Sequence, residues 1–138
     1  SKEPVQRETR ETAATLVRIA DSHIRFGHFE WIFHNKPTYL KDFADYVINR
    51  HYPDCTTADK PYAALLNAIV NRTATLMAQW QLVGFAHGVM NTDNFSITGC
   101  TFDYGPYGFL DVYKPSFVCN YTLSLHDALP IPDRKSVV

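Results

Sequence analysis

The sequence lacks an excess of charge of either sign, and it has no long hydrophobic run. Its 138 residues include 13 Lys and Arg and 14 Asp and Glu, which gives a formal net charge of −1. This balance supplies no polybasic surface for nucleic acid or for an anionic membrane. No apolar run approaches the roughly 20 residues that span a bilayer. We therefore expect neither nucleic acid nor a membrane among the partners of this protein.

Cysteine is also scarce. The three cysteines, Cys55, Cys100 and Cys119, are an odd number at wide spacing. That pattern fits reduced thiols better than a disulfide framework, and it predicts a reducing compartment. What remains is an ordinary globular composition, 46% hydrophobic and 20% charged. The chain is long enough for one domain with one core.

Apolar periodicity predicts an α+β chain that is mainly helical. The strongest pattern is a helix over 58–82, and a second helix over 38–52 should end before Pro53, which cannot continue it. The short and partly β-branched ATLVRIA at 14–20 predicts a strand. Side chains of the longer helix that recur at steps of three and four should face a core. They are Tyr62, Leu65, Leu66, Ile69, Thr73, Leu76, Met77 and Trp80.

The chain is predicted to form one unit with two distinct ends. Residues 1–12 are polar and predict a mobile leader, whereas 13–120 predict the folded unit. Within that unit, NFSIT and CTFDY are separated near Gly99 and predict a short β-hairpin, and GPYGF at 105–109 predicts a turn. Residues 121–138 continue no upstream pattern and match a translated sequencing adapter, so we expect a non-native tail there.

The stretch AHGVMNTDNFSITGCTFDYG at 86–105 concentrates acidic and amide side chains. Asp93 and Asn94 are neighbours, and Asp103 lies across the expected hairpin from Asn94. Carboxylate and amide oxygens suit Mg²⁺. Water molecules and substrate phosphates complete the coordination of this ion. An Asp base, an Asn and an Asp-aromatic-Gly in this order are typical of phosphoryl-transfer sites. The structural alternative is a capped loop, because Asp and Asn also form turns.

The same spacing can be compared with the protein-kinase catalytic loop, H-R-D-x-x-x-x-N. His87 and Asn94 keep its separation, but Val89 stands where a kinase has its catalytic Asp. The carboxylate has instead moved to Asp93, and D-Y-G at 103–105 stands for D-F-G. This pattern favours nucleotide and Mg²⁺ binding, and it argues against ordinary kinase chemistry.

Two segments resemble the selenoprotein O family, also called the YdiU or protein adenylyltransferase SelO family. They are WQLVGFAHGVMNTDNFSITGCTFDYGPYGFLDVYKPSFVCN at 80–120 and RIADSHIRFGHFE at 18–30. The motifs HGVMNTDN and DYGPYGFLD are the most specific, and the resemblance extends over residues 10–120. It implies a protein-kinase-like fold. It also implies transfer of AMP from ATP, rather than of phosphate, to Ser, Thr or Tyr hydroxyls of protein substrates.

The resemblance further implies roles for individual residues. Asp93 matches the family's proton acceptor, and Asn94 and Asp103 match its Mg²⁺ ligands, with Mn²⁺ as an alternative metal. In the family, the residue at Asp103 also lies beside the ATP. Arg18 and Arg25 match two arginines that contact the nucleotide phosphates, for which guanidinium forks are suited. The implied location is cytoplasmic for bacterial-type members and mitochondrial for eukaryotic relatives.

The chain also departs from the family's pattern. Family members are several times longer, and their Gly-rich nucleotide loop, phosphate-binding Lys and C-terminal selenocysteine or cysteine have no match here. We therefore expect a fragment of the intact enzyme that is inactive alone. Two other functions stay open. One is phosphotransfer, because HG-x(5)-N also resembles antibiotic phosphotransferases, and the other is a non-catalytic, nucleotide-binding pseudokinase module.

Overall fold

A computed structural model gives the fold of most of the chain. The described residues are 4–6, 10–12, 14–114, 117 and 119. The predicted non-native tail, 121–138, lies outside them. Within the described part, no helix has the length and apolar character needed to cross a membrane.

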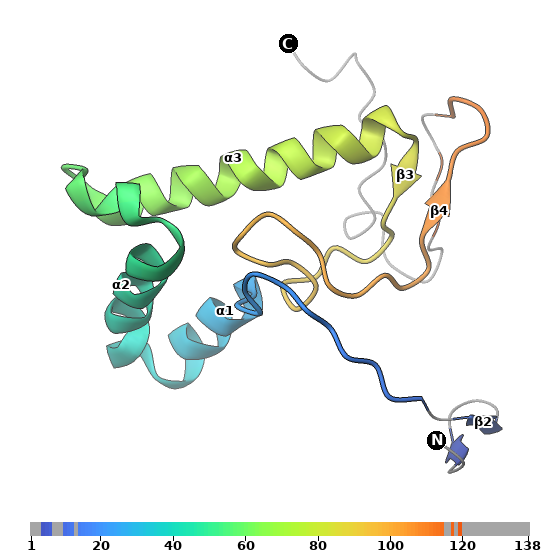
Figure 1. Ribbon diagram of the computed structural model, residues 1–138, viewed down its shortest axis with the longest axis horizontal. Coiled ribbons are helices and arrows are strands. Elements are labelled where there is room, and N and C mark those ends of the chain that lie inside the picture. Colours follow the sequence, from blue (N-terminus) through green and yellow to red (C-terminus); the bar gives the residue numbers. More distant parts are fainter. Residues whose placement is uncertain (1–3, 7–9, 13, 115–116, 118, 120–138) are drawn as a thin grey trace.

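A long helix, α3 (Pro61–Leu82), runs along the molecule and confirms the strongest predicted helix (Figure 1). It begins at Pro61 rather than at residue 58, because proline loses no hydrogen bond at the first helical position. Two shorter helices, α1 (Phe26–Asn35) and α2 (Leu40–His51), lie beside its first half. The chain is therefore α+β and mainly helical, as predicted.

The ends of α2 follow the prolines of the sequence. The short 3₁₀ helix η1 (Pro37–Tyr39) leads into α2, and η2 (Pro53–Thr57) follows it. The predicted helix over 38–52 is thus confirmed as α2 with one 3₁₀ turn in front. Pro53 ends the α-helix as expected, because it has no N–H to continue the helical hydrogen bonds.

The core lies where α2 and α3 meet the loop that comes after α3. Val47 and Ile48 of α2, Leu65 of α3 and Ile97 of the loop are buried together. Tyr52, just after α2, donates its hydroxyl hydrogen bond to the backbone carbonyl of Ile97. Burial of apolar surface and this polar contact fix the loop against the helices.

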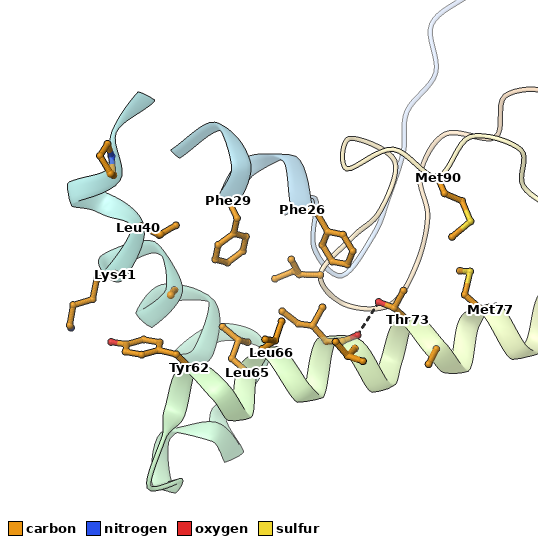
Figure 2. Close-up of a pocket in the computed structure, with 16 residues that line it drawn as sticks. Phe26, Phe29, Leu40, Lys41, Tyr62, Leu65, Leu66, Thr73, Met77 and Met90 are labelled. Atoms are coloured by element: carbon orange, nitrogen blue, oxygen red, sulfur yellow. Dashed lines mark hydrogen bonds between the residues drawn. The ribbon is translucent and has the colours of Figure 1, made fainter. Parts of the chain in front are cut away.

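The apolar stripe of α3 faces a groove that the described residues leave open. This helix groove has a volume of about 1010 Å³. Phe26 and Phe29 of α1 point toward α3 across it, and Met77 lies farther along α3 (Figure 2). Leu65 is buried, whereas Leu66 is 62% exposed. The predicted core-facing stripe is therefore confirmed at Leu65 and wrong at Leu66 and at Tyr62, which is 45% exposed.

The described strands form two small antiparallel sheets. β1 (Pro4–Gln6) pairs with β2 (Arg10–Thr12), so part of the predicted leader has secondary structure, and its mobility stays a prediction. β3 (Phe85–Ala86) follows α3 and pairs with β4 (Gly108–Phe109). The predicted turn over 105–109 is wrong at its last two residues, because β4 pairs with the edge of β3.

The predicted strand over 14–20 is wrong. This segment joins no sheet among the described residues and runs as an irregular line to α1 (Figure 1). Leu16, Val17 and Ile19 are between 78% and 93% exposed. Apolar and β-branched residues fit a pleated surface, but a strand also needs a neighbour for its backbone hydrogen bonds. The segment instead brings Arg18 to the loop after α3.

The predicted hairpin is confirmed as a short one, which we call the 94–102 hairpin. The N–H of Phe102 donates to the carbonyl of Asn94 at 2.9 Å, and pairing within the hairpin is a single bridge rather than two full strands. Gly99 makes the turn with φ +82° and donates its N–H to the carbonyl of Ser96 at 3.3 Å. The hairpin therefore places Asn94 beside Asp103, the residue that follows Phe102.

Replacing Gly99 with Ala is expected to destabilise the fold by about 1–3 kcal/mol, because left-handed backbone disfavours a side chain. A Cβ there would also lie 2.8 Å from the Cβ of Arg72 on α3. The midpoint of urea unfolding measures the loss. Gly105→Ala is the matched control, since its Cβ would lie 3.2 Å from a Val89 methyl and no positive φ is involved. Equal stability of the two variants would contradict the prediction.

Candidate functional site

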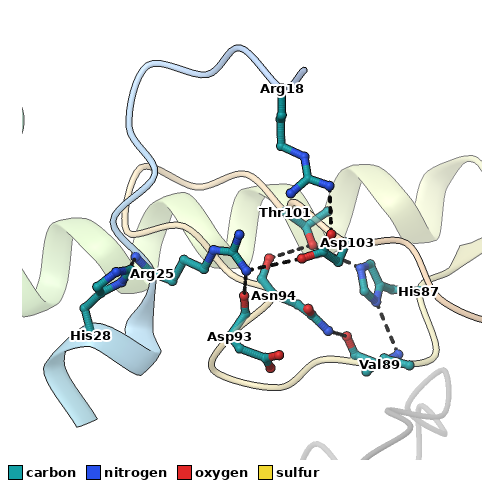
Figure 3. Close-up of polar contacts among 9 residues, drawn as sticks. All are labelled: Arg18, Arg25, His28, His87, Val89, Asp93, Asn94, Thr101 and Asp103. Carbon is teal, nitrogen blue, oxygen red and sulfur yellow. Dashed lines mark hydrogen bonds and ion pairs between the residues drawn. The ribbon is translucent and has the colours of Figure 1, made fainter. Parts of the chain in front are cut away.

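The 94–102 hairpin brings two of the predicted site residues to the same end. Asn94 accepts the backbone hydrogen bond of Phe102, and Asp103 is the next residue. Thr101 reinforces this register, because its hydroxyl donates to the carbonyl of Asn94 at 2.9 Å. Asn94 and Asp103 therefore lie together, as the sequence predicts (Figure 3).

Asn94 is held by the backbone at the position where a kinase has the Asn of its catalytic loop. Its Nδ2 donates to the carbonyl of Val89 at 3.0 Å, and the residue is only 6% exposed. Its backbone N–H donates to the carbonyl of Asn91 at 3.0 Å, which closes a turn. Because the amide nitrogen is used in this way, the amide oxygen is the atom left to accept from or coordinate a ligand.

Asp103 is the point on which both predicted arginines converge. Arg18 Nη2 lies 2.7 Å from Oδ1, and Arg25 Nη1 lies 3.2 Å from Oδ2 (Figure 3). The side chain of Asp103 is 48% exposed, and those of the arginines are 31% and 26% exposed. Two positive charges thus face one carboxylate, and the cluster has an excess of positive charge for an anionic ligand.

Arg25 also joins Asp93 to the site. Its Nη1 donates to the backbone carbonyl of Asp93 at 2.5 Å. Its own backbone N–H donates to His28 Nδ1 at 3.0 Å, so this arginine caps the start of α1. The Asp93 residue is exposed, and no hydrogen bond or ion pair engages its carboxylate in the described part of the chain. That carboxylate is accordingly available to a substrate.

The start of α1 pins the loop that carries Asp93. The N–H of Gly27 donates to the carbonyl of Thr92 at 2.8 Å, and the Thr92 hydroxyl donates to the Glu30 carboxylate at 2.6 Å. A Cβ at Gly27 would lie 3.3 Å from the Thr92 carbonyl oxygen, so the approach is close. The loop and the arginine of α1 are therefore fixed to each other.

His87 braces the site from inside. It is 2% exposed and stacks on Trp80 of α3 at 5.3 Å. Burial lowers the pKa of its imidazole, which favours the neutral ring. Nδ1 accepts the N–H of Val89 at 3.2 Å, and Nε2 lies 3.0 Å from the hydroxyl of Thr101. One buried ring thus connects the loop at Val89 with the hairpin at Thr101.

Phe102 is a site residue that sequence reasoning missed. Its ring lies under the guanidinium groups of Arg25 and Arg18, at 4.9 Å and 5.7 Å from the ring centroid. The ring of His23 stacks on it at 5.3 Å, nearly parallel. The signal was present in the sequence, because an aromatic residue directly precedes Asp103.

The donor set fits a hard cation in chemistry and is small in number. Asp103 supplies a carboxylate and Asn94 an amide oxygen, which are ligand types that Mg²⁺ prefers. No group of three or more His, Cys, Asp or Glu that could hold a metal occurs among the described residues. A Mg²⁺ ion here would therefore take most of its ligands from water and from phosphate oxygens. It would also compete with two guanidinium groups for the carboxylate of Asp103.

The geometry defines a class of site in which two guanidinium groups, a carboxylate and a buried amide lie together at the open end of a β-hairpin. A family model described as protein adenylyltransferase SelO matches residues 1–126. The chain belongs to this family, and the resemblance found in its sequence is confirmed.

Curated relatives agree with this assignment. A protein of Thioalkalivibrio sulfidiphilus named protein nucleotidyltransferase YdiU is 61% identical over 120 residues, which are 86% of this chain and 24% of the relative. A protein of the same name from Aliivibrio fischeri is 59% identical over 123 residues, 88% of this chain and 25% of the relative. One from Pseudomonas putida is 54% identical over the same shares. The chain thus spans about a quarter of the length of the curated relatives it matches.

Proposed function

We propose that this chain carries the nucleotide and metal site of a protein adenylyltransferase with a protein-kinase-like fold. The observation that carries the proposal is the convergence of Arg18 and Arg25 on Asp103, at 2.7 Å and 3.2 Å. Guanidinium groups bind phosphate oxygens well, and two of them converge on the single carboxylate of Asp103. Family membership and the name of the relatives support nucleotidyl transfer as the reaction.

In this proposal Asn94 and Asp103 would hold Mg²⁺, or Mn²⁺ in its place, and the metal would supply charge stabilisation to the triphosphate of ATP. Arg18 and Arg25 bind phosphate oxygens and offset their charge. Asp93 accepts the proton of a Ser, Thr or Tyr hydroxyl of a protein substrate. The hydroxyl oxygen forms a bond to the α-phosphorus, the bond from that phosphorus to the bridging oxygen breaks, and pyrophosphate leaves.

The fold contributes mainly positioning. His87, Thr101 and the turn at Asn94 hold the loop and the hairpin in register, so little of the site has to move when the substrate binds. The proposed partners are ATP and protein substrates. The location proposed with them is the cytoplasm, since the curated relatives cited above are bacterial.

A chimera allows the test, because the chain alone spans only a quarter of its relatives. In this chimera, the aligned residues of the chain replace the matching segment of the Thioalkalivibrio sulfidiphilus protein. ATP labelled at the α or the γ position is then supplied with Mg²⁺ and a protein mixture. Label is expected to reach protein from the α position, and the unaltered relative serves as the control.

The other outcomes separate the alternative functions. Label that reaches protein only from the γ position would support a phosphotransferase and exclude AMP transfer. Binding of Mg-ATP with no transfer from either position would support a pseudokinase module. Neither binding nor transfer in the chimera, with activity in the unaltered relative, would mean that the residues of this chain do not form the proposed site.

A further inference from the structure

One aromatic ring contacts both arginines of the candidate site. The guanidinium carbon of Arg25 lies 4.9 Å and that of Arg18 lies 5.7 Å from the centroid of the Phe102 ring. Both distances are within the range of about 6 Å over which a ring attracts a cation. Phe102 is 5% exposed and the two arginine side chains are about one quarter to one third exposed, so this contact is partly shielded from water and is stronger than one on an open surface.

The Phe102 ring is itself fixed. His23 stacks on it with the ring centroids 5.3 Å apart and the planes 6° from parallel. The backbone N–H of Phe102 donates to the carbonyl of Asn94 at 2.9 Å. The ring therefore has a set position relative to Asn94, and it offers both guanidinium groups a surface that does not depend on the carboxylate of Asp103.

Such a surface is needed because Asp103 has two competing tasks. In the structure its two oxygens pair with Arg18 and Arg25. Coordination of a cation by the same carboxylate weakens those pairs. Arginine side chains have large rotamer freedom, so without a second contact they would disperse just when phosphate has to be bound.

We propose that Phe102 is a positioning residue that keeps Arg18 and Arg25 over the phosphate site when Asp103 turns to the metal. This inference rests on the proposed function, because it assumes that the ligand is a metal–triphosphate complex. The quadrupole of the ring attracts the guanidinium groups whether or not the carboxylate is free, and the ring competes for neither phosphate nor metal.

The test measures the dissociation constant of Mg-ATP by calorimetry in the chimera. Phe102→Leu is expected to weaken binding by about five- to thirtyfold, since two cation–π contacts are lost. Phe102→Tyr should restore binding to within about twofold, because it keeps the ring. Phe95→Leu is the matched control: Phe95 is 3% exposed, lies on the same hairpin and has no cation–π contact with any arginine that the structure describes.

A second measurement separates positioning from a general structural role. In an Arg18→Ala/Arg25→Ala background, adding Phe102→Leu is expected to change Mg-ATP binding by less than about twofold, because the ring then has no guanidinium to hold. Phe102→Met, which fills similar space without a ring, runs in parallel in case the Leu variant unfolds. The thermal midpoint of each variant reports folding.

The outcomes are distinct for the two proposals. If the unaltered chimera binds Mg-ATP and the Phe102→Leu and Phe102→Met variants bind it as tightly as the unaltered chimera does, the role of Phe102 is overturned and the proposed function stands. If Phe102→Leu is as harmful without the arginines as with them, the ring is structural only and the role is overturned as well. If the unaltered chimera does not bind Mg-ATP while the relative does, both proposals are overturned together.

Discussion

Asp103→Asn is expected to lower α-label transfer by the chimera about a thousandfold, because it removes a charge placed beside the transferred group. Asparagine keeps the size of the side chain but neither pairs as strongly with guanidinium groups nor binds Mg²⁺ as a carboxylate does. The substitution weakens both the proposed metal coordination and the positioning of the arginines, since the same carboxylate contacts Arg18 and Arg25.

The effect of Asp103→Asn on ATP affinity should change direction with Mg²⁺, whereas a folding defect would weaken binding with and without the metal. Without Mg²⁺, the carboxylate of Asp103 repels the triphosphate and occupies both arginines. Metal-free ATP is therefore expected to bind Asp103→Asn at least as tightly as the unaltered chimera. With Mg²⁺ the order reverses, and the variant binds more weakly. Calorimetry in EDTA and in Mg²⁺ measures both affinities.

Stability should change little, because the ion pairs of Asp103 are partly exposed to water. Exposed pairs contribute about 1 kcal/mol or less. Asp111→Asn is the matched control, since Asp111 is exposed and forms no ion pair with another described residue. Unchanged Mg-ATP affinity and unchanged transfer in Asp103→Asn would show that the site has been placed wrongly.

Local signals were enough to predict α2, α3 and the hairpin, but not α1. The three- and four-residue recurrence of apolar side chains indicated α3, and Pro53 indicated the end of α2. Gly99 indicated the turn of the hairpin, because only glycine adopts φ +82° without cost. In each case the signal and the structure it predicts lie within a few residues of each other.

Pairings between distant segments could not be predicted in this way. β4 pairs with β3 across the whole hairpin region, and residues 14–20 looked like a strand but pair with no other strand in the described part. The stripe of α3 predicted a core-facing surface, yet periodicity cannot say whether another element covers it. Leu66 and Val70 are accordingly more than half exposed along the helix groove.

The residues of the candidate site also differ in how far their sequence signals were local. Asp93, Asn94 and Asp103 follow from motif and spacing, because they belong to one hairpin region. Arg18 is 85 residues from Asp103, and only the resemblance to a family indicated it. Phe102 was missed because its role depends on the two guanidinium groups that the fold brings to it.

Asp93→Asn is expected to lower the turnover number of the chimera by about 10²–10⁴, as is usual when a positioned proton acceptor is lost. Affinity for Mg-ATP should stay within about twofold, since no ion pair or side-chain hydrogen bond of Asp93 is removed in the described part. Arg25 should also stay in place, because it binds the backbone carbonyl of Asp93, which asparagine retains. Single-turnover transfer of α-label measures the chemical step apart from binding.

The opposite pattern distinguishes a proton acceptor from a binding residue. If Asp93 only oriented the nucleotide, the dissociation constant of Mg-ATP would rise and the turnover number would fall little. If it takes the proton, the turnover number falls and the dissociation constant of Mg-ATP stays unchanged. Asp59→Asn, at an exposed carboxylate before α3, is the control and should leave both quantities unchanged. Full turnover in Asp93→Asn would remove Asp93 from the chemistry and assign proton removal to solvent or to another group of the intact protein.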